Sequence, residues 1–124
     1  MVNSLQARTK LLEIEITNNE LTNESLETFA SSVFPENTGL RKIVLSCNYI
    51  GVNSENFLTG SYHNSQTPAD AVTFFLEHAL IDLIRLEHLD LSTNYLSDDT
   101  VEPIATLLFA NSSCQMKILN LEHN

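Results

Sequence analysis

The sequence has few basic residues, with 6 lysines and arginines against 16 aspartates and glutamates and a formal net charge of −10. Nucleic-acid affinity depends chiefly on cations that meet phosphates, so this balance argues against a nucleic-acid-binding protein. An anionic membrane surface is disfavoured for the same reason. A basic protein partner would instead be attracted, and its approach would be accelerated.

Long apolar runs are also missing. No stretch of the 124 residues is apolar over the length needed to cross a membrane, and the start, MVNSLQARTK, lacks the apolar segment of a secretory signal. The two cysteines, Cys47 and Cys114, suit free thiols in a reducing compartment. These features predict an intracellular, cytoplasmic protein, and the length amounts to one domain.

Motifs of catalysis and ligand binding are absent as well. The sequence has no Gly-rich phosphate loop, no nucleophile motif and no recognisable Cys–His pairing. His88 and Asp90 lie two residues apart, but no third metal ligand accompanies them. Asp98 and Asp99 fit a helix start better than a calcium site, because no loop with ligand spacing follows. The sequence therefore predicts no enzyme, no cofactor and no bound metal.

What the chain does contain is one stretch, LEHLDLSTNYL at residues 86–96, whose spacing recurs. Apolar residues stand 8, 5 and 3 positions before Asn94 and 2 positions after it. Asn19 and Asn48 have the same set, and Asn124, where the sequence stops, has the three preceding positions. These asparagines are 29, 46 and 30 residues apart, so one interval holds an insertion of 17 residues relative to the shortest spacing.

Local patterns predict strands before the asparagines and helices after them. Apolar and polar residues alternate before each asparagine, which predicts strands over 12–16, 42–46, 87–91 and 117–121. Apolar residues at steps of three and four predict helices over 22–34, 69–80 and from about 99. Thr67-Pro68 is a helix-start signal, whereas the inserted residues, about 53–67, are rich in Asn and Ser and predict a surface loop.

This succession of strand, turn, helix and return resembles the leucine-rich repeat, and the repeat length resembles the ribonuclease-inhibitor-like class with 28 or 29 residues. The resemblance implies an α/β solenoid with four parallel strands on the concave side and three helices on the convex side. It covers residues 1–124 as a single domain, with repeats starting near 11, 40, 86 and 116.

The asparagines have a structural role in this interpretation. A side-chain amide that points into the turn can bond backbone groups of its own repeat and of the neighbouring one. The members of this expected ladder are Asn19, Asn48, Asn94 and Asn124. We assign them no other function.

Leucine-rich repeat proteins commonly bind partners on the concave surface. In this chain that surface would be mainly acidic, with Lys42 as its one side chain that is fully cationic at neutral pH. The predicted function is therefore non-enzymatic recognition of a protein, and the acidic surface favours a basic partner. The candidate contacts are Glu13, Glu15, Lys42, Ser46, His88, Asp90, Ser92, Asn120 and Glu122. The alternative is that these are ordinary solvated strand residues. In the insertion the candidates are Phe57, Tyr62 and His63, with a passive loop as the alternative.

Other interpretations stay open. Some proteins of this repeat class regulate small GTPases, and Arg8, Arg41 and Arg85 would be the residues to consider for a GTPase-activating role. The high Asn content and the missing signal resemble leucine-rich repeat effectors that intracellular bacteria deliver to the host cytosol. Both end strands would be open edges, which predicts either an excerpt of a longer repeat array or self-association with another copy.

Overall fold

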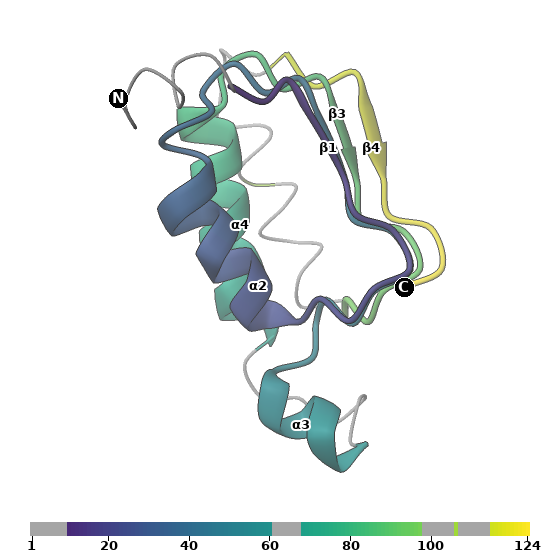
Figure 1. Ribbon diagram of the computed structural model, residues 1–124. Coiled ribbons are helices and arrows are strands. Elements are labelled where there is room, and N and C mark those ends of the chain that lie inside the picture. Colours follow the sequence, from purple (N-terminus) through teal and green to yellow (C-terminus); the bar gives the residue numbers. More distant parts are fainter. Residues whose placement is uncertain (1–9, 61–67, 98–105, 107–114) are drawn as a thin grey trace.

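The computed structural model describes residues 10–60, 68–97, 106 and 115–124 of the chain. Strands and helices alternate along these residues. In chain order they are β1 (Glu13–Glu15), α2 (Asn23–Thr28), the π-helical turn η1 (Phe29–Val33), β2 (Lys42–Val44), α3 (Ser54–Thr59), α4 (Pro68–Asp82), β3 (His88–Asp90) and β4 (Ile118–Asn120). The strands form one layer, and α2 and α4 form a second layer on one side of it (Figure 1).

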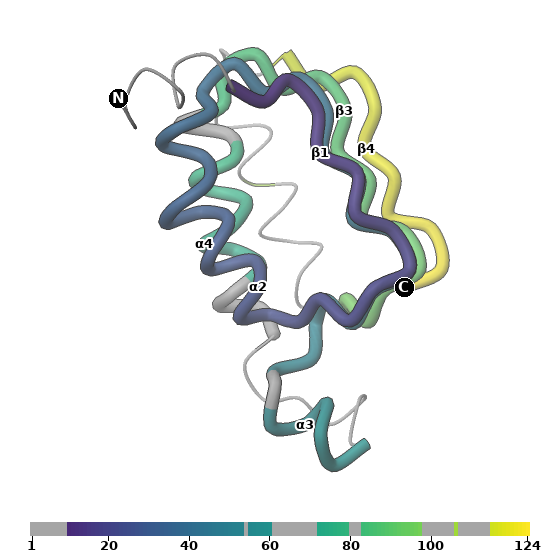
Figure 2. The backbone as a smooth tube through the Cα atoms, viewed as in Figure 1, coloured from purple at the N-terminus to yellow at the C-terminus, as the bar shows by residue number. Residues whose placement is uncertain are grey.

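The four strands form one parallel sheet in the order β1-β2-β3-β4. In register, Ile14 pairs with Ile43, Ile43 with Leu89, and Leu89 with Leu119. The coils that carry these strands follow nearly the same path and stack on one another (Figure 2). The predicted α/β fold with four parallel strands is confirmed, and each three-residue strand lies within its predicted range.

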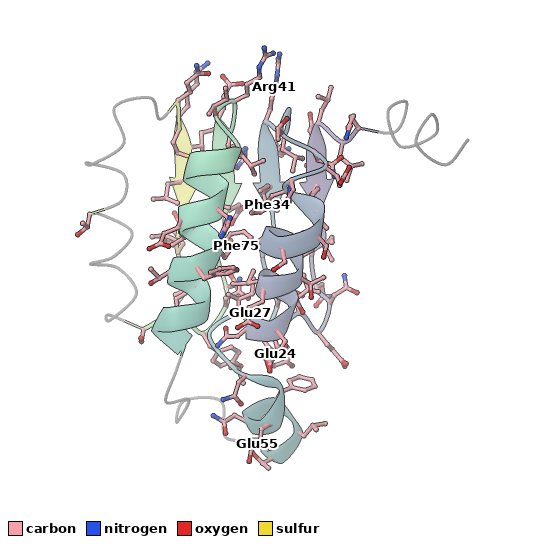
Figure 3. The ribbon with its side chains drawn as sticks, turned by 90° about the vertical axis from the view of Figure 1, so that its left-hand side faces the viewer. Glu24, Glu27, Phe34, Arg41, Glu55 and Phe75 are labelled. Atoms are coloured by element: carbon pink, nitrogen blue, oxygen red, sulfur yellow. The ribbon has the colours of Figure 1, made fainter. Side chains whose placement is uncertain are left out.

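The hydrophobic core lies between the sheet and the two long helical segments. Strand alternation turns one residue of each short strand inward, and the helices contribute residues spaced three or four apart. The residues at most 2% exposed include Leu26, Ala30, Phe34, Ile43, Leu45, Phe75, Leu76, Ala79, Leu89 and Leu91. The rings of Phe34 and Phe75 meet between the helices with centroids 5.3 Å apart (Figure 3).

Helix α2 and the turn η1 together occupy the predicted helix 22–34. Thr22 precedes the helix in an extended conformation, and its backbone N–H donates to Ser25 Oγ at 3.1 Å. Glu24 lies in the first turn, where a carboxylate is favourable beside the free N–H groups. The last turn widens into η1, in which Phe34 N–H donates to the carbonyl of Phe29 at 2.9 Å.

Helix α4 begins at Pro68, where the sequence predicted a helix start, and it ends two residues beyond the predicted range. Proline has no backbone N–H, and this absence costs little at the first position of a helix, which explains why Pro68 can start α4. Of the helix predicted from about residue 99, with Pro103 in its first turns, the described residues include only Thr106, which is helical.

The prediction of a loop throughout the insertion is wrong over α3. Asn53 starts this helix by accepting a hydrogen bond from Asn56 N–H at 2.8 Å, and Gly60 ends it with a φ of +78°. Six residues are too few to display a helical apolar period, so the pattern gave no signal. The helix projects away from the stacked coils (Figure 1), and only Phe57 of the three candidate insertion contacts lies within the described residues.

Close packing of neighbouring turns requires glycine at position 51. Gly51 has a φ of +105°, and a Cβ at this position would lie 2.1 Å from the carbonyl oxygen of Tyr95. We expect Gly51→Ala to lower the free energy of unfolding by about 2 kcal/mol or more, measured by urea denaturation.

Gly39→Ala is the matched control, because the nearest atom to its added Cβ, Leu12 Cδ2, lies at an ordinary 3.7 Å. We expect a change below about 0.5 kcal/mol. Equal losses in the two variants would contradict the close approach of Gly51 to Tyr95.

Candidate partner-binding surface

The outward strand side chains form three rows across the sheet, because strands in register place equivalent positions side by side. The first row contains Glu13, Lys42, His88 and Ile118. The second row contains Glu15, Val44, Asp90 and Asn120. The third row lies two positions further along each coil and contains Thr17, Ser46, Ser92 and Glu122. All nine candidate concave contacts therefore come from this one side of the sheet.

The cation on this surface is paired. Lys42 Nζ lies 2.6 Å from Glu15 Oε1, and Glu13 is the strand neighbour of Lys42. The hydrogen bond from Lys42 to Glu15, together with the charges of Glu15 and Glu13, raises the pKa of Lys42 against the opposing effect of desolvation. The carboxylates of Glu13, Asp90 and Glu122 have no ion pair with any of the described residues. The surface is therefore net negative.

Short backbone contacts orient two of the polar side chains. Asp90 Oδ1 accepts a hydrogen bond from Ser92 N–H at 2.9 Å, and Asn120 Oδ1 accepts one from Glu122 N–H at 3.0 Å. These bonds hold each side chain against the backbone two residues further along its own coil. They leave a second oxygen of Asp90 available to a partner.

Ser92 differs from the other candidates because it is buried, with 9% of its surface exposed. Its carbonyl oxygen accepts hydrogen bonds from Cys47 N–H and from Asn94 Nδ2, both at 3.1 Å. Among the nine candidate contacts Ser92 is therefore the least accessible to a partner, whereas Ser46 is half-buried and bonded to Thr17 by its hydroxyl at 3.4 Å.

The asparagine side chains connect successive coils. Asn94 Oδ1 accepts from Ile50 N–H at 3.0 Å, and Asn94 Nδ2 donates to the carbonyls of Leu45 and Leu91, also at 3.0 Å. Asn48 repeats this arrangement one coil earlier, where its Oδ1 accepts from Asn19 N–H at 3.0 Å. The carbonyl of Leu45 thus accepts from both side chains.

The end asparagines are exposed. Asn124 Oδ1 accepts from Leu96 N–H at 3.1 Å, and its Nδ2 donates to the carbonyl of Leu91 at 3.0 Å. The side chain of Asn19 donates only to the carbonyl of Thr17 within the described residues, at 3.1 Å. This side chain therefore differs from the other three, since it bonds its own coil alone.

Beyond the sheet, the turns enclose a groove of about 770 Å³ that sequence reasoning did not identify. The groove is lined by the residue before each asparagine, which has a positive φ between 53° and 61°, namely Asn18, Cys47, Thr93 and His123. A second row in its lining consists of the residues after three of the asparagines, namely Glu20, Tyr49 and Tyr95. Aligning the sequence on its asparagines would have shown this second row.

The tyrosines of this groove are stacked, with ring centroids 5.7 Å apart and planes 7° from parallel. Phe57 of α3 packs edge-on against Tyr49 with centroids 4.7 Å apart. Phe57, a candidate for partner contact, therefore anchors the insertion to the turns. Its neighbour Leu58 is 83% exposed, and Tyr62 and His63 lie outside the described residues.

Cations gather at the opposite edge of the sheet, where the strands begin. Arg41 and Arg85 line a second hollow with Glu87, and Lys117 Nζ lies 2.6 Å from Glu87 Oε1. This bond to Lys117 lowers the pKa of Glu87, with a smaller effect of the Arg41 charge in the same direction. Arg41 lies at the far end of the molecule from Glu24 and Glu55 (Figure 3). Arg8 lies outside the described residues.

The described residues contain no group of three His, Cys, Asp or Glu side chains arranged to hold a metal ion. None of their helices is long and apolar enough to cross a membrane.

The stack of parallel strands with helices packed on one side of the sheet is an α/β repeat architecture. Within it, residues 85–107 match the family model described as Leucine Rich Repeat. The matched residues include β3 and Asn94, and this segment is similar to one leucine-rich repeat. No significant match was found among curated proteins or among solved structures. Leucine-rich repeat proteins generally act as protein-binding modules.

The hydrogen bonds of Asn94 lead to a stability prediction. Asn94→Ala removes the acceptor of the buried Ile50 N–H, and an unpaired buried group costs about 1 to 3 kcal/mol. We expect a loss of at least about 1 kcal/mol in the free energy of unfolding, measured by urea denaturation.

Asn19→Ala removes the same side chain from an exposed position. We expect it to change the free energy of unfolding by less than about 0.5 kcal/mol. A denaturation curve for Asn94→Ala that overlays the curve for Asn19→Ala would show that the bonds between coils contribute nothing.

Proposed function

We propose that the chain recognises a basic protein segment on the concave sheet face and does so without catalysis. The observation that carries this proposal is the unbalanced charge of the face. Glu13, Asp90 and Glu122 have no cationic partner among the described residues, and Lys42 is neutralised by Glu15. A protein-binding role also agrees with the leucine-rich repeat at residues 85–107.

The acidic face would act first on the rate of encounter. Charges of one sign on one surface attract an oppositely charged partner over about a Debye length, roughly 8 Å at physiological salt. Such steering raises association rates more than it raises affinity. The exposed half of Ile118 and the half-buried Val44 add apolar contacts beside these charges. A partner that combines a basic residue with a neighbouring apolar one would fit both.

Other proposals have less support. The class with 28 or 29 residues per repeat is favoured by the register of β1 and β2, whose partners Ile14 and Ile43 are one such repeat apart. A GTPase-activating role would place Arg41 or Arg85 in the partner, but these residues lie at the strand-start edge, beside Glu87. The cytoplasmic location, the origin as a bacterial effector and self-association through the end strands stay predictions from the sequence.

The first experiment identifies the partner by affinity capture from cell lysate and then measures association rates with the purified partner. We expect the double reversal Glu15→Lys with Asp90→Lys to slow association by about tenfold at low salt, because steering falls with the charge of the face. Rates measured by biolayer interferometry at two salt concentrations test this expectation. High salt should reduce the difference between the two proteins.

The matched control is Glu27→Lys with Glu55→Lys, which changes the net charge equally but on α2 and α3. Both residues are exposed and lie away from the sheet (Figure 3). We expect the control to slow association by less than about twofold. If both double variants slow association equally, the net charge of the chain accounts for steering, and the concave face is not the recognition surface.

A further inference from the structure

The groove along the turns has a volume typical of ligand sites. Its volume of about 770 Å³ lies within the range of about 300 to 1,000 Å³ seen for such sites. It crosses the turns of all four coils, because its wall includes Asn18, Cys47, Thr93 and His123. Three strand spacings correspond to about 14 Å, which is the length of about four residues of extended chain.

One end of the groove is anionic. Glu20 is exposed, and its carboxylate makes no ion pair or hydrogen bond with any of the described residues. It occupies the position equivalent to Tyr49 and Tyr95 in the coil before them. The Glu20 carboxylate therefore lies at the end of the row that contains the stacked rings of Tyr49 and Tyr95.

A carboxylate beside an aromatic stack is suited to a cation. The faces of tyrosine rings attract cations through the ring quadrupole, at distances up to about 6 Å from the centroid. An arginine side chain fits this pair of groups better than a lysine does, because its planar guanidinium both stacks on rings and bonds carboxylates through two N–H groups. The amides of Asn18 and Asn19 at the same end offer further acceptors.

We propose that the groove along the turns binds an extended peptide segment whose arginine side chain meets the Glu20 carboxylate beside Tyr49. The segment belongs to another protein, and its backbone lies along the turns toward Thr93 and His123. Charge complementarity selects this occupant, since the chain has a net charge of −10 and the open carboxylate lies at one end of the groove. The site is separate from the concave face and does not require the function proposed for that face.

The test is a titration of the ¹⁵N-labelled full chain with a short peptide, followed by NMR. The probe is acetyl-Ser-Val-Arg-Val-Ser-amide, whose valines favour an extended backbone. We expect saturable shift changes centred on the amides of residues 18–20, 47–49 and 93–95. The same peptide with citrulline, a neutral side chain of the same shape, should bind about fivefold more weakly, as expected for the loss of one exposed ion pair.

Variants connect the effect to Glu20. In Glu20→Gln the arginine and citrulline peptides should bind equally, so the fivefold ratio falls to about one. Glu27→Gln changes the net charge equally on α2 and should keep the ratio at about fivefold.

Several outcomes would overturn the proposal. They are shift changes confined to β1, β2 and β3, equal binding of the two peptides to the unmodified chain, and a ratio that survives Glu20→Gln. Binding of free arginine amide as tightly as the peptide would also overturn it, because the groove would then hold a side chain without an extended segment. The absence of saturable shifts at millimolar peptide would show that the groove does not bind this class of ligand.

Discussion

The side-chain amide of Asn94 is the interaction on which the arrangement of the coils depends. It accepts a hydrogen bond from Ile50 N–H in the preceding coil and donates to the carbonyls of Leu45 and Leu91 in two successive coils. Asn48 makes equivalent contacts one coil earlier. Backbone groups buried at a turn need partners, and here each coil supplies the partners for the one before it. These hydrogen bonds therefore determine how each coil is positioned relative to the coil before it.

The outward surfaces follow from that position. Once the coils are in register, the residues at equivalent positions must form rows, whatever their chemistry. One set of rows collects Glu13, Asp90 and Glu122 on the sheet face. Another collects Glu20, Tyr49 and Tyr95 along the turns. Both proposed binding surfaces therefore depend on bonds that are made in the interior.

Much of the fold could be predicted because its signal repeats. Four sets of apolar positions around Asn19, Asn48, Asn94 and Asn124 predicted the strands, and their spacing predicted the register that the sheet shows. Helix α3 could not be predicted, because it is six residues long and is held by a local cap at Asn53. The burial of Ser92 could not be predicted, because a strand pattern does not show how closely a neighbouring coil approaches each position. The groove could not be predicted from the strand pattern, because Glu20 and Tyr49 are 29 residues apart and both lie outside the strands.

The separation of charge along the strands has a mechanical consequence. Arg41, Arg85 and Lys117 lie where the strands begin, whereas Glu20, Glu24 and Glu55 lie at or beyond the turns that follow them (Figure 3). These described side chains therefore contribute an electric dipole moment along the strand direction in addition to the net charge of the chain. In the field of a charged partner, such a dipole experiences a torque, so the molecule rotates before contact and presents its turns to a cationic surface.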